Sequence, residues 1–428
     1  MTDIAAELQR IPGVVLLHTF DLPTYKAVSF TGNPGPEILN DNRFVDYNVT
    51  TLDSKAELDQ FSGHAAQLVT TGKDIELLKS SQVVPSGVQR TIMKLPAFNN
   101  TSIDMTENAS WTNTTLPITN TMTAGCEIQR TVQLNNNTNM SSFDTNVDIA
   151  ILDTGVSLLH PDLNVYRNVS VINGSINGDD GNGHGTIVAG IAAAKDNDIG
   201  IAGTAPGARI WSIQACDPLG ECKITNQMKG VEYAIQHADE IDILNISIEN
   251  PNSPALNNLI DQAVKAGITV VVSAGNHGKD ASSTSPANNP NVITVSAIAD
   301  SDGICGGAGP DLTIPNIKSN LPDDTFASFS NFGPAVKIAA PGVNILSTYK
   351  DAGYAMDSGT SMAAPFVSGY AALYKTQNPY SMPPEVMSNV LGAGSLPNTV
   401  CDGGSHGYFE GDIDTSHEPL LYYQQISR

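Results

Sequence analysis

Three short segments of the sequence carry side chains that together could cleave an acyl bond. Asp153 begins Asp-Thr-Gly, His184 lies in Gly-His-Gly-Thr, and Ser361 lies in Gly-Thr-Ser-Met-Ala-Ala-Pro. A serine hydroxyl is a weak nucleophile until a neighbouring base removes its proton, and histidine commonly acts as that base. A carboxylate behind the imidazole fixes its tautomer and stabilises its positive charge. These residues, in the chain order Asp, His, Ser, therefore predict covalent catalysis through an acyl-enzyme.

A fourth segment could stabilise the negative charge that forms during such a reaction. Asn276 follows the apolar run 268–273, and its amide could donate to a tetrahedral oxyanion together with the Ser361 backbone N–H. Ser361 begins an apolar stretch that reads as a helix over 361–374. The unpaired amides and the positive dipole end of a helix start favour an anion at that position.

The four segments together resemble the motifs of the subtilisin-like serine proteases. The histidine motif extends to Gly-His-Gly-Thr-Ile-Val-Ala-Gly, and Ala274-Gly275-Asn276 matches the oxyanion asparagine of that family. The resemblance covers about residues 81–375 outside 98–145, and it covers 1–55 weakly. It implies a serine endopeptidase that acts on protein or peptide substrates, with Asp153, His184, Ser361 and Asn276 as catalytic residues.

The elements that must position these residues alternate between strand and helix from Val147 onward. Apolar runs predict strands over 147–152, 208–215, 241–248, 268–273 and 292–299, and helices are expected over 184–194, 226–238, 254–266 and 361–374. Such alternation predicts an α/β fold, a mostly parallel sheet with helices on both faces. Asp153 and Asn276 then fall at carboxyl ends of strands, where open α/β sheets place their sites.

The first 80 residues are expected to form a separate small α+β segment. Short strands are predicted at 14–17, 25–30 and 44–47 around a helix near 36–40, and 53–80 reads as a polar helix or linker. This arrangement is similar to the inhibitory prodomain of the family. The resemblance implies that the chain's own prodomain is an inhibitory partner and that the chain cuts itself near Ser80–Gln82. Residues 81–428 then form the catalytic domain, with the Asn- and Thr-rich stretch 98–145 as a surface insertion.

A structural calcium ion is the one cofactor that the resemblance implies. The segment 194–201 resembles the tight calcium loop of the family, and calcium takes six to eight oxygen ligands. The implied ligands are Gln82, Asp162, Asn197 and the carbonyls of Lys195, Ile199 and Ile201. A solvated acidic turn remains the alternative. Asp179-Asp180 reads as a charged loop, or as a weaker cation site.

Two segments take the place of the family's substrate-binding strands. Gly220-Glu221-Cys222 aligns with the edge strand, and 244–249 aligns with the strand opposite it. The implied substrate-binding residues are Glu221, Ser247, Glu249, Ser273 and Gly275. The family commonly has glycine where Glu249 stands. Glu221, Glu249 and Asp217 predict an acidic groove that favours basic residues two to four positions before the cut, unless these carboxylates point to solvent.

Charge and hydropathy exclude two classes of partner. Lys and Arg number 21 and Asp and Glu number 44, a net charge of −23, whereas nucleic-acid binding needs clustered basic residues. No apolar run approaches the length of a membrane-spanning helix. We therefore expect no nucleic-acid partner and no membrane span. A monomer is a separate expectation.

The sequence also favours a secreted glycoprotein with a disulfide, although no signal peptide is visible. Cys216 and Cys222 bracket a short loop and are the best pair among five cysteines, Cys305 with Cys401 is a weaker pair, and Cys126 is unassigned. Asn245 lies in a predicted buried strand and should be unmodified. Glycosylation sequons occur at Asn48, Asn99, Asn100, Asn108, Asn113, Asn136, Asn139, Asn168, Asn173 and Asn245.

Two other functions stay open at this point. Asp153-Thr-Gly and Asp357-Ser-Gly-Thr mimic the paired aspartates of pepsin-like proteases, in which two carboxylates share one proton. That fold is essentially all-β, which the strand–helix alternation disfavours. The other alternative is a non-catalytic binding protein on the same α/β fold, although every group that catalysis requires is present.

Overall fold

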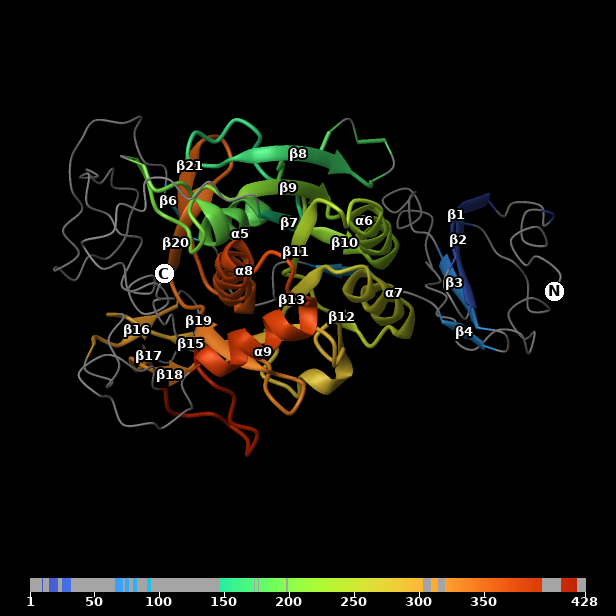
Figure 1. The fold of residues 1–428 in the computed structure, drawn as a ribbon. Helices are drawn as coiled ribbons and strands as arrows, with labels where there is room; N and C mark the ends of the chain where they lie inside the picture. The colour runs from blue at the N-terminus through green and yellow to red at the C-terminus, as the bar shows by residue number, and fades with distance from the viewer. Residues whose placement is uncertain are drawn as a thin grey trace, which may run out of the picture.

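The computed structural model describes most of the chain from residue 147 onward and six short strands before that residue (Figure 1). The later described segments are 147–172, 174–175, 177–197, 199–302, 309–314, 320–394 and 409–421. The earlier strands, described by their backbone, are β1 (Val15–Asp21), β2 (Tyr25–Thr31), β3 (Ala66–Thr71), β4 (Asp74–Glu76), β5 (Ser80–Gln82) and β6 (Thr91–Met93).

An eight-stranded sheet forms the centre of the molecule. Its strands run in the order β18-β15-β13-β11-β7-β9-β8, and β19 also pairs with β15. All of these pairings are parallel except β15 with β18. The bounds are β7 (Asp148–Asp153), β8 (Val165–Ser170), β9 (Arg209–Gln214), β11 (Ile241–Ile246), β13 (Thr269–Ser273), β15 (Ile293–Ala299), β18 (Thr325–Phe326) and β19 (Ile338–Pro341).

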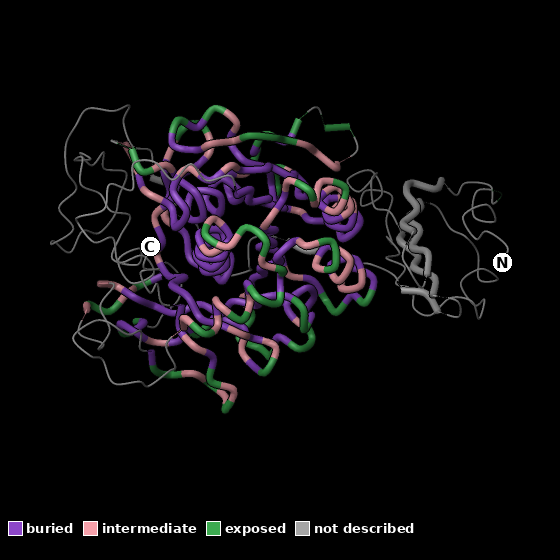
Figure 2. The backbone as a smooth tube through the Cα atoms, viewed as in Figure 1, coloured by how far each residue is buried: buried purple, intermediate pink, exposed green. Residues whose placement is uncertain are grey.

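Helices cover both faces of this sheet, which explains why its strands read as continuous apolar runs. α5 (His184–Ala193) and α8 (Thr360–Gln377) pack with Ile149 and Ile151 on one face. α6 (Ile224–Gln236) and α7 (Pro254–Lys265) pack with Ala150 and Leu152 on the other. Figure 2 shows the buried segments concentrated along the sheet, α5 and α8. The predicted α/β class is confirmed.

Shorter elements complete the described chain. β20 (Ile345–Tyr349) and β21 (Gly353–Asp357) form an antiparallel hairpin, and β6 pairs with β21. α9 (Pro383–Ala393) packs against α8. The remaining elements are β10 (Glu221–Lys223), β12 (Asn250–Pro251), η1 (Ala281–Ser283), β14 (Thr284–Ser285), β16 (Leu312–Thr313) and β17 (Asn320–Leu321). No helix among the described residues combines the length and the apolar character that crossing a membrane requires.

One segment of the N-terminal region differs from the sequence prediction. Residues 53–80 were expected as a polar helix or linker, but β3 and β4 lie within them and extend the antiparallel sheet β1-β2-β3-β4. β3 pairs with β2 over six residues, so the free edge of β2 decides the conformation here and the weak local pattern does not. The helix expected near 36–40 and the strand expected at 44–47 lie outside the described residues.

Candidate active site

Asp153 and His184 form a buried pair at the carboxyl end of β7. Asp153 Oδ1 lies 2.7 Å from His184 Nδ1, and the residues are 0% and 2% exposed. Asp153 Oδ1 also accepts a hydrogen bond from the Thr154 backbone N–H at 2.7 Å. Gly185 permits this close approach, since a Cβ there would lie 2.1 Å from Gly155 O. With Nδ1 donating to the carboxylate, the other ring nitrogen, Nε2, can act as a base.

Asp180 holds the start of α5, the helix that begins at His184. Its Oδ1 accepts hydrogen bonds from Gly183 N at 2.7 Å, Asn182 N at 2.9 Å and Thr154 Oγ1 at 2.9 Å. Its Oδ2 accepts from both the backbone and the hydroxyl of Thr186. A carboxylate at this end satisfies unpaired amides and complements the helix dipole. The sequence reading of Asp180 as a solvated charge or a weak cation site missed this role.

Ser361 lies in the first turn of α8, close to the segment after β11. Its Oγ donates to Ser247 O at 3.3 Å, and its backbone O accepts from Ser247 Oγ at 3.1 Å. α8 packs against α5. α5 starts beside the end of β7, and α8 starts beside the end of β13. Ser361 is 4% exposed. The nucleophile candidate and the His184–Asp153 pair thus lie at the same edge of the sheet.

Asn276 is fixed by one atom of its side-chain amide. Its Oδ1 accepts hydrogen bonds from Thr360 N at 2.7 Å and Thr360 Oγ1 at 3.0 Å. A backbone N–H can only donate, so this contact identifies which amide atom is the oxygen. Nδ2 is left as the group that can donate to a substrate oxygen beside the start of α8.

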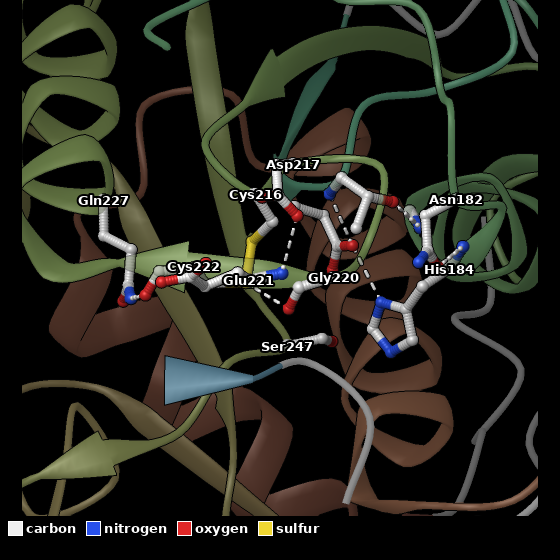
Figure 3. The surroundings of a disulfide bond; sticks show 12 residues. Asn182, His184, Cys216, Asp217, Gly220, Glu221, Cys222, Gln227 and Ser247 are labelled. Atoms are coloured by element: carbon white, nitrogen blue, oxygen red, sulfur yellow. Dashed lines mark hydrogen bonds and ion pairs between the residues drawn. A yellow bond between two sulfur atoms is a disulfide. The ribbon is translucent and has the colours of Figure 1, made fainter. Parts of the chain in front are cut away.

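The edge strand β10 borders this site, and β5 of the same chain lies on it. The antiparallel register pairs Gln82 with Glu221, Ser81 with Cys222 and Ser80 with Lys223. The predicted disulfide between Cys216 and Cys222 is confirmed and closes the loop before β10 (Figure 3). Asn182 Nδ2 donates to Pro218 O of that loop at 3.1 Å, which connects it to the start of α5.

Gln227, another residue that sequence reasoning missed, connects β10 to the segment that follows β11. Its Nε2 donates to Cys222 O and to Asn250 Oδ1, both at 3.0 Å, and Asn250 Nδ2 donates back to its Oε1 at 2.9 Å. Gln227 is 0% exposed. A fully buried amide with these bonds fixes the distance between β10 and the segment that contains Glu249.

The residues predicted to bind substrate, and Asp217 with them, occupy three kinds of position. Glu221 lies on β10, and Ser247 lies beside Ser361, so both border the site. Ser273 ends β13, buried, and Gly275 lies in the loop after it. Glu249 and Asp217 use their carboxylates within the protein: Glu249 contacts Asn276 and His277, and Asp217 Oδ1 accepts from Leu219 N and Glu221 N, both at 2.9 Å. The preference for basic substrates stays a prediction that rests mainly on Glu221.

The expected calcium loop wraps around a buried carboxylate. Asp162 is 0% exposed and accepts hydrogen bonds from Asn197 Nδ2 at 3.0 Å, Ile201 N at 3.1 Å and the Tyr354 hydroxyl at 3.1 Å. Burial raises the pKa of Asp162 to about 6. A buried carboxylate with a side-chain amide beside it offers the kind of oxygen ligands that calcium takes, so the chemistry of these residues fits the ion. The backbone of Gln82, by contrast, pairs with Glu221 of β10.

Two further groups of buried carboxylates lie outside the predicted sites. Asp300, Asp323 and Asp324 have carboxylate oxygens within 4.8 Å of one another, the only such metal-compatible group within the described residues. Glu418 accepts a hydrogen bond from Ser296 Oγ, and burial raises its pKa to about 7. Both groups include residues of loops whose sequences have neither helical nor strand periodicity, so no pattern in the sequence indicated that these carboxylates lie together.

The predicted glycosylation sites and the other three cysteines lie partly within and partly outside the described residues. Asn245 is 0% exposed and Asn168 is exposed, as a buried and a surface sequon should be. Cys126, Cys305 and Cys401 lie outside the described residues, as do the sequons at Asn48, Asn99, Asn100, Asn108, Asn113, Asn136, Asn139 and Asn173.

Similarities to known proteins agree with this geometry. The family model described as the subtilase family matches residues 144–399. Subtilisin BL of Lederbergia lenta is 37% identical over 261 residues, which are 60% of this chain and 85% of that protein. Subtilisin DY of Bacillus licheniformis is 37% identical over 238 residues, 55% of this chain and 78% of that protein. The structure of a cold-adapted subtilisin-like serine proteinase superposes with a TM-score of 0.54 at 27% identity, covering 70% of this chain and 98% of that one.

These matches decide between the functions that the sequence left open. The pepsin-like alternative is wrong, because the sheet is largely parallel and helix-covered and Asp153 pairs with His184. A purely binding function is also set aside, since the matched family and relatives are proteases. The fold, the buried Asp–His pair and a family match over more than half of its length make this chain a member of the subtilase family of serine endopeptidases.

Proposed function

We propose that Asp153, His184 and Ser361 form the catalytic triad of this endopeptidase. His184 removes the proton from Ser361 Oγ as that oxygen attacks the carbonyl carbon of the scissile peptide bond. Asp153 holds the imidazolium that results. His184 then gives the proton to the leaving amine as the C–N bond breaks, and a water molecule activated in the same way releases the acyl group.

The observation that carries this proposal is the 2.7 Å contact between Asp153 and His184 in a buried environment. It sets the tautomer that leaves Nε2 as a base, and α8 brings Ser361 to the same edge of the sheet. Ser361 Oγ donates to Ser247 O in this structure, and a hydroxyl rotates easily to a new partner. Catalytic hydrogen bonds often form only once substrate is bound.

We also propose that Asn276 Nδ2 and the Ser361 backbone N–H receive the oxyanion. Support comes from the fixed amide orientation of Asn276 and from the position of Ser361 in the first turn of α8. In subtilisin, loss of one such donor lowers kcat by about 10²–10³.

The chain is proposed to be a zymogen that processes itself. Support comes from β5, which lies on the substrate-side strand β10 in an antiparallel register. An extended peptide that adds to an exposed edge strand gains main-chain hydrogen bonds, and a segment of the chain itself can do so before any substrate arrives. Purified Ser361→Ala protein should then keep its N-terminal segment, whereas the unaltered protein loses it; trimming of the pure variant at the same bond would show that another protease makes the cut.

A structural calcium ion is proposed at Asp162, Asn197 and the carbonyls of Lys195, Ile199 and Ile201. Support comes from the buried carboxylate and its raised pKa, because a cation in the loop would compensate the buried charge. When bound, the ion would supply positive charge that holds the 195–201 loop on the Asp162 segment.

Secretion as a glycosylated monomer is the remaining part of the proposal. The disulfide supports an oxidising compartment, and the exposed sequon at Asn168 is accessible to glycosylation. Mass spectrometry of protein from a eukaryotic secretion host would report glycans and prosegment removal together.

Active-site labelling tests the central assignment. A fluorophosphonate probe should label the processed protein once, at Ser361, and peptide hydrolysis should stop in Ser361→Ala. The exposed Ser282 offers a matched control, because Ser282→Ala should keep full labelling and turnover. Normal hydrolysis by Ser361→Ala would refute the triad while leaving the family membership intact.

A further inference from the structure

Glu249 connects the two loops that follow β11 and β13. Its Oε2 accepts a hydrogen bond from the backbone N–H of Asn276 at 2.7 Å, and its Oε1 lies 2.5 Å from Nδ1 of His277. Its side chain is only 15% exposed. Both carboxylate oxygens thus have protein partners on the loop that carries the oxyanion donor.

We propose that Glu249 is a positioning residue that places Asn276 for its part in catalysis. This inference rests on the proposed function, in which Asn276 Nδ2 donates to the oxyanion. Under this proposal Glu249 affects the rate of the chemical step, kcat. Its position in the aligned substrate strand had instead suggested that it selects substrates.

The loop that carries Asn276 needs outside contacts to hold its shape. Gly275 and Gly278 adopt φ values of 105° and 57°, which glycine reaches without strain but which also leave the chain many alternatives. Asn331 holds one side of the loop, donating to Ala274 O at 2.9 Å and accepting from His277 N at 3.0 Å. Glu249 packs against the same glycine: a Cβ on Gly275 would lie 2.2 Å from Glu249 Oε2 and 2.3 Å from Asn331 Nδ2.

The position of the donor atom depends on this backbone contact. Thr360 fixes only Oδ1 of the Asn276 side chain, so the place of Nδ2 is set by Thr360 together with the Asn276 main chain. Glu249 is the partner of the Asn276 backbone N–H, and hydrogen bonds to an ionised carboxylate are shorter and stronger than neutral ones. A shift of about 1 Å in a reacting group can cost ~10² in rate. Loss of the Glu249 contact should therefore slow the chemical step more than it weakens substrate binding.

The test measures kcat and KM for a chromogenic peptide anilide with five processed variants. These are Glu249→Ala, Glu249→Gln, Asn276→Ala, the double variant Glu249→Ala/Asn276→Ala, and the control Glu385→Ala, which removes an exposed carboxylate in α9. Active enzyme is counted by fluorophosphonate titration, so that misfolded protein does not enter kcat. If Glu249→Ala does not fold, Glu249→Asp replaces it, because that side chain keeps its charge and is one methylene too short to reach.

We expect Asn276→Ala to lower kcat by about 10²–10³. Glu249→Ala should lower kcat roughly tenfold with little change in KM, because Asn331 and Thr360 still hold the loop. Glu249→Gln should recover most of the loss, since its amide oxygen can accept from Asn276 N. The double variant should be no slower than Asn276→Ala, because without the donor nothing remains to be positioned.

Three results would overturn the inference. A change in KM alone would make Glu249 a substrate-pocket residue, and multiplicative losses in the double variant would mean that Glu249 acts independently of Asn276. A full kcat in Glu249→Ala would remove its role altogether. Wild-type kcat in Asn276→Ala would refute the proposed oxyanion hole itself, an outcome that the other three do not produce.

Discussion

Glu418 should make the protein less stable as the pH rises from about 4.5 to neutrality. It is 3% exposed, its Oε1 accepts from Ser296 Oγ, and its Oε2 is buried without a hydrogen-bond partner. Burial raises its pKa from 4.5 to about 7, and the nearby charges of Asp412 and Asp414 add to the rise. The folded state therefore holds a proton between pH 4.5 and 7 that the unfolded state has released. Linkage then requires the free energy of unfolding to fall across that interval.

The size of the effect follows from the same shift. A rise from 4.5 to about 7 corresponds to at most ~3 kcal/mol of lost stability above pH 7. Glu418→Gln cannot ionise, yet its amide oxygen can keep the hydrogen bond from Ser296. We expect the variant to match the parent near pH 4.5 and to exceed it by about 1–3 kcal/mol at pH 8, which would raise Tm on the order of 2–6 °C.

Thermal unfolding of both proteins from pH 4.5 to 8 measures this difference. Both should carry Ser361→Ala to prevent self-digestion, and they should be compared at one scan rate because proteases often unfold irreversibly. Glu385→Gln, at the exposed start of α9, is the matched control and should show no such divergence. Parallel curves for Glu418→Gln and its parent would refute the buried-carboxylate reasoning.

Three further predictions concern the loops around the site. Chelation of calcium should lower Tm, because a ligand that binds the native state at a hundredfold excess over its Kd adds about 2.7 kcal/mol to the free energy of unfolding. Asp162→Ala should abolish most of that response, and equal Tm values with and without chelator would exclude the ion. Asp180→Asn should cost roughly 3 kcal/mol of stability and reduce kcat, because its NH₂ would face the Thr186 donors; a wild-type Tm would argue against it. Glu221→Gln should weaken a several-fold preference for basic residues, an effect of ~0.2–1 kcal/mol that salt removes; a salt-independent profile would contradict it.

The sequence predicted those parts of the molecule that local patterns encode. The cap of α7 is an example: Ser253 accepts from Leu256 N, and Pro254 is the first helical residue, as expected. Asp153 and Asn276 could be placed at strand ends because the apolar runs before them are continuous. These features need only residues that are close in the chain.

Contacts between distant segments were the part that the sequence did not predict. The Glu249–Asn276 contact joins residues 27 apart, and a carboxylate at a position where glycine is usual gives no indication of its partner. β3 was missed for a related reason, because its pairing with β2 decides its conformation. α9 was missed although Pro383 at its start and Glu385 in its first turn are local signals of a helix start. Asp180 looked like a solvated charge because its partners, the amides at the start of α5, have no side-chain signature.

If β10 binds substrate as proposed, the presence of β5 on it also sets how substrates compete for the enzyme. A segment tethered to the same chain has an effective concentration in the millimolar range, and this does not change when the protein is diluted. If the free segment bound with a Kd of about 10 µM, the tether would raise the apparent Kd of every competing peptide roughly 100-fold. Once the chain is cut, the segment is no longer tethered and its concentration becomes that of the bulk solution. Diluting the cleaved protein would therefore dissociate the segment and free the active site, whereas diluting the uncut protein would not.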